Sequence, residues 1–203
     1  HLPHRQNRFR VEAEIVRDLT LDASGQLSRK VGGESVYPPL PLGVAQLSYA
    51  NNFKWAVSGG EDRYRRGLYT FFKRTSPHPN LTTFDCPDSN VTCVKRNISN
   101  TPIAALATLN NSVFTDAAKA MAKRLIKERN SDSERIAMGF QLCTARKPST
   151  KEAAAFLTLL RKAKLYYGEN ETEAKAFNGD AEASAWATLT RIFLNLDEFI
   201  TRE

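Results

Sequence analysis

The chain has 203 residues, of which 41% are hydrophobic and 25% charged, and this composition excludes a disordered or fibrous protein. No apolar stretch approaches the roughly 20 residues that a membrane-spanning helix needs. The net charge of +7 is of the sign expected for a protein that binds nucleic acid. Because acidic residues interrupt the basic ones along the whole chain, we expect a mildly basic surface and no nucleic-acid partner.

The first residues, His1-Leu2-Pro3-His4-Arg5, contain neither an initiator Met nor an apolar signal core. We therefore expect residues 1–203 to be a piece excised from a longer polypeptide.

The first predicted element is a helix over residues 8–27, in which apolar residues recur at helical spacing and Gly25 supplies a stop. The run Pro38-Pro39-Leu40-Pro41 then favours extended backbone. Residues 44–58 predict a β-hairpin, because apolar residues alternate on either side of Asn51-Asn52.

A basic and aromatic stretch over residues 61–74 follows and predicts a further helix with an acidic first turn. On that helix Leu68, Phe71 and Phe72 would face the core. Residues 75–101 then form a long loop with three prolines and many polar residues. Because so long a loop is unusual in a compact domain, we expect it to be functional or held in place by contacts.

From residue 101 onward the pattern predicts five amphipathic helices in succession. Candidate caps are Thr101, Asn111 or Ser112, Ser131 or Asp132, and the segment 148–152. The helices are expected over about residues 103–109, 113–126, 136–142, 151–167 and 186–199. The predicted fold class is therefore mainly α: an antiparallel helical array with a small β-hairpin and a long ordered loop.

The basic stretch contains the candidate ligand-binding residues Arg65, Arg66, Tyr69 and Arg74. Arginine binds carboxylate and sulfate groups through two parallel hydrogen bonds, and tyrosine rings stack on sugar faces, which indicates an anion or sugar site. The alternative is a structural role, in which the arginines pair with Asp85, with Asp88 or with loop carbonyls.

His78 lies between two prolines and, with Asp85, is the candidate for a catalytic base or a metal ligand. No second histidine or cysteine stands at ligand spacing, so we predict no metal site. Nucleophile motifs are also missing from the sequence, which leaves open whether the chain takes part in catalysis.

Cys86 and Cys93 bracket a six-residue loop, so a short disulfide between them is plausible, and two free thiols are the alternative. Cys143 lies near the end of a predicted helix and is expected to be a buried single thiol.

Several stretches together resemble a known family. They are GEDRYRRGLYTFFKR (residues 60–74), FDCP (84–87), NTPIAAL (100–106), LNN (109–111) and the ending IFLNLDEFITRE (192–203). This order of motifs is similar to that of the C-terminal domain of unknown function in planctomycete-type secreted proteins that are associated with c-type cytochromes.

The resemblance implies that residues 1–203 form a single helical domain, the C-terminal fragment of a longer, multidomain protein that is exported, periplasmic or extracellular, and in which other domains precede this one. It implies no cofactor in this chain, and places haem c, where the parent protein carries it, in another domain. Such proteins are common in bacteria that degrade complex, often sulfated polysaccharides. Cys86 stands where the family more often has a small residue, and the exported setting favours the disulfide to Cys93.

Two hypotheses about function follow. The first is a non-catalytic helical module that packs on the upstream domains, with acidic or sulfated polysaccharide as a candidate ligand. The second is one wall of an active site shared with those domains, in an oxidoreductase or a carbohydrate-active enzyme. The sequence favours the first, because no acid–base pair is identifiable in it.

Overall fold

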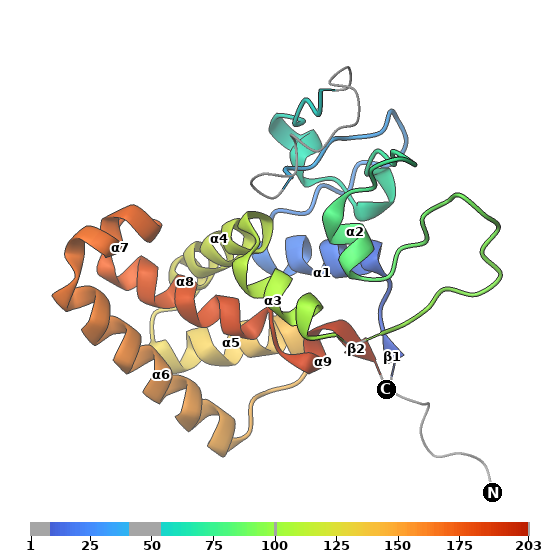
Figure 1. Ribbon diagram of the computed structural model, residues 1–203. Coiled ribbons are helices and arrows are strands. Elements are labelled where there is room, and N and C mark those ends of the chain that lie inside the picture. The colour runs from blue at the N-terminus through green and yellow to red at the C-terminus, as the bar shows by residue number, and fades with distance from the viewer. Residues whose placement is uncertain (1–8, 41–53, 100, 203) are drawn as a thin grey trace, which may run out of the picture.

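The computed structural model describes residues 9–40, 54–99 and 101–202. This part of the chain is mainly α-helical, as predicted, and carries one small antiparallel sheet (Figure 1). None of its helices has the length and apolar character needed to cross a membrane.

The α-helices are α1 (Ala13–Ser24), α2 (Pro79–Thr83), α3 (Pro102–Asn110), α4 (Ser112–Glu128), α5 (Asp132–Thr144), α6 (Thr150–Glu169), α7 (Glu171–Asn178), α8 (Ala181–Phe193) and α9 (Asp197–Ile200). Two short 3-10 helices, η2 (Gly60–Tyr64) and η3 (Gly67–Tyr69), lie between α1 and α2. The strands are β1 (Phe9–Arg10) and β2 (Thr201–Arg202).

The two strands bring the ends of the described chain together, because Phe9 pairs with Arg202 and Arg10 with Thr201. This sheet is not the hairpin that the sequence predicts over residues 44–58. Most of that segment lies outside the described residues, and its described part, residues 54–58, forms no strand.

The predicted helices of the second half are confirmed, and capping side chains explain where several begin. Asn111 accepts the backbone N–H of Val113 at the start of α4. Ser131 and Ser149 each form a capping box with the glutamate three residues later. The last predicted helix is divided into α8 and α9 by a turn, and α7 is an additional helix between α6 and α8.

The main hydrophobic core lies where α4 and α8 pack together, with α5, α6 and α9 around them (Figure 1). Trp186, Met121 and Leu125 at its centre are completely buried. A smaller cluster joins α1, α2 and the start of α4, and partly buried Leu19 and Ile200 pack against both clusters. The two clusters are therefore continuous.

Helix α1 is shorter than the predicted helix, but it ends as expected, at Gly25 with φ of 77°. Arg124 of α4 donates to the carbonyls of Asp22 and Ala23, which are among the last carbonyls of α1. This contact fixes the end of α1 on the helical core.

The predicted helix over residues 61–74 is wrong: η2, η3 and extended backbone take its place. Isolated bridges to Ser28 and Val36 hold the segment in place of the hydrogen bonds of a continuous α-helix. Gly67 lies so close to α1 that a Cβ atom there would be 2.5 Å from the carbonyl oxygen of Glu14. One consequence is that Leu68, expected in the core, is 69% exposed.

Candidate functional site

Arg65, the first candidate ligand-binding residue, is buried, with 2% of its surface exposed. Its guanidinium donates to the carbonyl oxygens of Gly32 and Glu34 and stacks 3.8 Å from the centre of the Tyr69 ring. A guanidinium that is enclosed in this way supports the 32–34 loop and is inaccessible to a ligand.

The other three candidates differ in exposure. Tyr69 is half-buried, and its hydroxyl accepts the N–H of Gly32 at 2.8 Å. Arg66 is exposed and pairs with Asp18 of α1 at 3.0 Å, and Arg74 is exposed. The segment thus matches the structural alternative at Arg65, whereas Arg66 and Arg74 stay open to solvent.

His78 is 3% exposed and caps the N-terminus of α2. Its Nδ1 accepts the backbone N–H of Asn80 at 3.2 Å, so the ring proton is on Nε2, which lies 3.2 Å from the carbonyl oxygen of Pro39. Burial lowers the pKa of His78 to about 4; the hydrogen bond to Pro39 opposes the shift and the charge of Arg17 adds to it. His78 is therefore a neutral, structural residue at pH 7.

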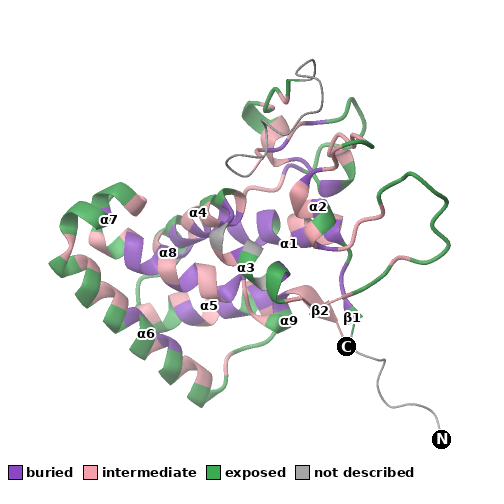
Figure 2. Cartoon of the chain, viewed as in Figure 1, coloured by how far each residue is buried: buried purple, intermediate pink, exposed green. Residues whose placement is uncertain are grey.

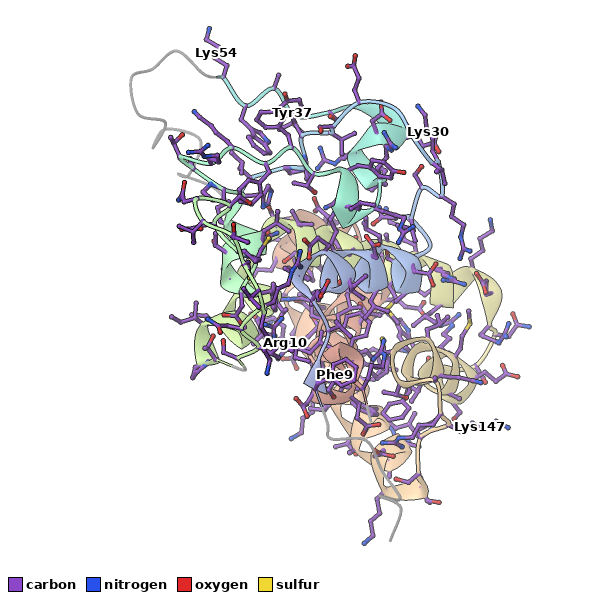
Figure 3. All side chains as sticks on the ribbon, turned by 90° about the vertical axis from the view of Figure 1, so that its right-hand side faces the viewer. Phe9, Arg10, Lys30, Tyr37, Lys54 and Lys147 are labelled. Carbon is purple, nitrogen blue, oxygen red and sulfur yellow. The ribbon has the colours of Figure 1, made fainter. Side chains whose placement is uncertain are left out.

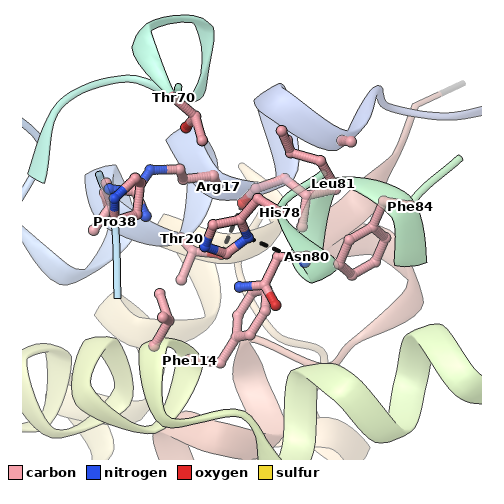
Figure 4. Close-up of a pocket in the computed structure, with 13 residues that line it drawn as sticks. Arg17, Thr20, Pro38, Thr70, His78, Asn80, Leu81, Phe84 and Phe114 are labelled. Atoms are coloured by element: carbon pink, nitrogen blue, oxygen red, sulfur yellow. Dashed lines mark hydrogen bonds between the residues drawn. The ribbon is translucent and has the colours of Figure 1, made fainter. Parts of the chain in front are cut away.

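The cavity beside His78 is small (Figure 4). Its volume of about 20 Å³ is enough for a water molecule and not for a substrate. Arg17 reaches into its wall and donates to the carbonyls of Arg63 and Arg65, and burial lowers the pKa of this guanidinium to about 10. Apart from a few such polar groups, the wall is apolar.

Asp85 closes the long loop. Its carboxylate accepts hydrogen bonds from the backbone N–H and the hydroxyl of Ser99 and from the buried guanidinium of Arg10, at 2.5 to 2.9 Å. Burial by itself raises the pKa of Asp85, but the bonds from Ser99 and Arg10 outweigh it and hold the pKa below its usual value. We call these three residues the Arg10–Asp85–Ser99 clamp; Arg10 lies on β1 (Figure 3).

The clamp holds both ends of the 86–98 loop, whereas the middle of the loop points into solvent. Val91, Val94 and Ile98 are 78%, 98% and 54% exposed. Arg96 is the loop's main further contact, because it binds Glu14 of α1 at 2.8 Å. The loop is therefore fixed at its base and presents apolar side chains at its surface.

The disulfide predicted between Cys86 and Cys93 is not present, and all three cysteines are free thiols. Cys86 faces Glu14 at 3.8 Å, and burial together with that carboxylate raises the pKa of its thiol to about 11. Cys93 is exposed and contacts the carbonyl of Lys95 instead, although both thiols line one groove of about 450 Å³. Cys143 is buried, as predicted.

Sequence reasoning missed two residues that organise this region, Arg10 and Glu14. Arg10 is 75 positions from Asp85 and Glu14 is 82 from Arg96, and no local pattern signals contacts at such separations. Within residues 9–40, 54–99 and 101–202, no three His, Cys, Asp or Glu side chains are placed to hold a metal ion.

No curated protein and no solved structure matches the chain. A family model does match it, over residues 1–160, and that family is described as a protein of unknown function. The match confirms the resemblance to an uncharacterised domain family. The chain therefore belongs to the PSD1 family of proteins of unknown function (DUF1553).

Proposed function

We propose that the chain is a non-catalytic helical module that packs on other domains of the same polypeptide through its 86–98 loop. The observation that carries this proposal is the combination of a fixed base and an apolar surface in that loop. Val91 and Val94 contribute little apolar burial within the chain, because they are 78% and 98% exposed. Burial against a neighbouring domain gives these side chains a role.

The charged groups of the region support this view. Arg10 and Arg65 donate hydrogen bonds to backbone carbonyls, and Asp85 accepts hydrogen bonds from Arg10 and from the backbone N–H of Ser99. Arg96 is held by Glu14 in the same way. Such groups position a surface, and they are not free to transfer protons to a substrate.

The resemblance of the motifs adds three features to this proposal: an exported setting, upstream domains and a neighbouring c-type cytochrome domain. Within such a polypeptide the described chain would pack on the other domains and support them. Electron transfer would take place in the cytochrome domain.

Binding of acidic or sulfated polysaccharide is a further part of the proposal. Because Arg65 and Tyr69 are engaged with each other and with the 32–34 loop, this binding rests on the exposed Arg66 and Arg74. The alternative, one wall of a shared active site, needs His78 or Asp85 at an accessible surface. The backbone contacts of both residues oppose it.

Cys93 provides a test, because its exposed thiol lies inside the 86–98 loop. We would measure the rate of maleimide labelling at Cys93 in the Cys86→Ala variant, in this chain alone and in the longer polypeptide with its preceding domains. Docking of the loop should slow labelling in the longer polypeptide. Cys143 is buried and should stay unlabelled in both.

Val94→Asp in the longer polypeptide should restore fast labelling, since a charge cannot be buried in an apolar contact without a large free-energy cost. The matched control is Val31→Asp, which adds the same charge at another exposed valine, 82% accessible, outside the loop. Equal labelling rates in the chain and in the longer polypeptide would show that the loop is not a docking element.

A further inference from the structure

Helix α6 has an outer face that is unusual for a surface helix. It packs on α5, α7 and α8 with one side, where Phe156 and Leu160 are buried. Figure 2 shows exposed residues along its other side, which forms an edge of the molecule. Small or apolar residues make up most of that side: Ala154, Ala155, Thr158, Leu159, Leu165 and Tyr166. The exposed Arg161 and Lys162 lie among them.

The size of these side chains changes along the helix. Ala154, Ala155 and Thr158 occupy the first half of the outer face, and Leu165 and Tyr166 occupy the second half, with exposures of 65% and 49% for the last two. Facing surfaces pack well when large residues meet small ones. A second α6 that runs in the opposite direction supplies this match, because its bulky half lies over the small half of the first.

The charges at the two ends of the outer face also differ. Lys147 and Lys151 are exposed at the N-terminal end, and Glu169 and Glu171 are exposed at the C-terminal end. A parallel pair would bring like charges together, whereas an antiparallel pair brings the basic end of each helix to the acidic end of the other.

We propose that two copies of this chain associate through an antiparallel contact between their α6 helices, centred between Thr158 and Leu159. In this register Ala155 lies opposite Lys162 of the other copy, which leaves room for the lysine stem to cover it. Lys151 lies opposite Tyr166, and Glu169 follows about 4.5 Å further along the partner helix. Helical side chains lean toward their own N-terminus, so Lys151 leans toward that glutamate.

The contact is isologous, since each copy uses the same face. A single helix about 30 Å long buries less surface than a permanent dimer needs, so the association is weak and depends on concentration. The terminal charge pairs are exposed to solvent, so added salt weakens it further.

Sedimentation equilibrium of this chain over a range of concentrations tests the proposal. The average mass should rise from 22.7 kDa toward twice that value as the concentration increases. Lys151→Glu places a glutamate near Glu169 of the other copy and should keep the mass at that of the monomer. Glu169→Lys should do the same, because it places a lysine near Lys151.

The double variant Lys151→Glu/Glu169→Lys restores opposite charges in the antiparallel register and should restore dimerisation. Both substitutions also suit the helix dipole, so the variants should fold. Lys123→Glu makes the same charge change on an exposed residue of α4 and should leave the dimer intact.

A protein that stays monomeric at all concentrations would overturn the proposal. The outer face of α6 would then be a candidate contact for another domain of the polypeptide. A dimer that is insensitive to Lys151→Glu, or that the double variant fails to restore, would overturn the antiparallel register and with it the proposed contact.

Discussion

Individual polar residues in the first half of the chain hold backbone in place, and His78 is the clearest case. Its ring replaces the usual Ser, Thr, Asp or Asn at the start of a helix and also reaches the carbonyl of Pro39. A residue that the sequence presents as a possible catalyst is thus the cap that orders the turn after residues 75–77.

The stability of the protein should therefore depend on pH through His78. Well above pH 6.5 the imidazole is neutral in both the folded and the unfolded chain. As the pH falls through 6.5 toward 4, His78 binds a proton in the unfolded chain but stays neutral in the folded chain. The free energy of unfolding therefore falls, by about 3 kcal/mol at most.

Urea unfolding of the protein and of His78→Asn between pH 4 and pH 7.5 measures this effect. Asparagine keeps a capping side chain but does not titrate, so the variant should lose less stability on acidification. Parallel pH profiles for the two proteins would contradict a buried, neutral His78.

Asp85 is the second residue with a measurable role. Asp85→Asn keeps the size of the side chain and a residue type that tolerates its φ of 60°, but removes the charge that pairs with buried Arg10. We expect a loss of about 2 kcal/mol in the free energy of unfolding. Trypsin should also cut faster after Lys95, because the base of the 86–98 loop is released.

Asp88→Asn is the matched control for this change. Asp88 is an exposed residue of the same loop whose carboxylate bonds to Asn90 nearby, so its loss should change stability by less than about 0.5 kcal/mol. Equal effects of the two substitutions would rule out the clamp.

At the scale of the elements, α5 approaches the core so closely that Gly139 has no room for a side chain. A Cβ atom there would lie 2.7 Å from the Phe193 ring and 3.0 Å from Leu125. Gly139→Ala should destabilise the protein by about 1–3 kcal/mol, since this clash exceeds the gain in helix propensity.

Gly168 in α6 is the natural comparison, because a Cβ atom there meets no atom of the described residues within 4 Å. Gly168→Ala should raise stability by about 0.5–1 kcal/mol through helix propensity alone. Thermal unfolding of both variants distinguishes the two effects, and a stabilising Gly139→Ala would show that α5 and α8 are less closely packed.

The elements that the sequence predicts correctly are those with local signals. Ser131, Ser149 and Gly25 mark helix ends by their own chemistry, and the apolar periodicity predicts the helical segments between such ends. The segment 61–74 fails for a physical reason. Its backbone bonds to residues 28 and 36, and a helix there would break contacts that no local pattern reveals.

At the scale of the whole molecule, the sequence locates the important region but not its organisation. The long loop was expected to be functional or held in place, and the clamp at Asp85 holds it. The partner of Asp85, however, is Arg10 and not one of the nearby arginines. Pairs such as Arg10 with Asp85 depend on how β1 and α1 pack, which only the folded chain determines.

Polysaccharide binding can be tested on the intact chain by affinity electrophoresis. A gel with sulfated polysaccharide should retard the protein more than a neutral one, and added salt should weaken the retardation. The double variant Arg66→Ala/Arg74→Ala should be retarded less. Lys127→Ala, which removes an exposed charge from α4, should have less effect. Equal mobility in both gels would contradict binding through these arginines.

The pairing of β1 with β2 has a topological consequence. Because Phe9 and Arg202 are neighbours, the described chain is nearly a closed ring, and a short linker could join its two ends without disturbing the helices. Polypeptide that enters through β1 and polypeptide that leaves through β2 pass the same point of the surface. In an array of domains, this one would therefore lie to one side of the line along which the polypeptide connects its neighbours.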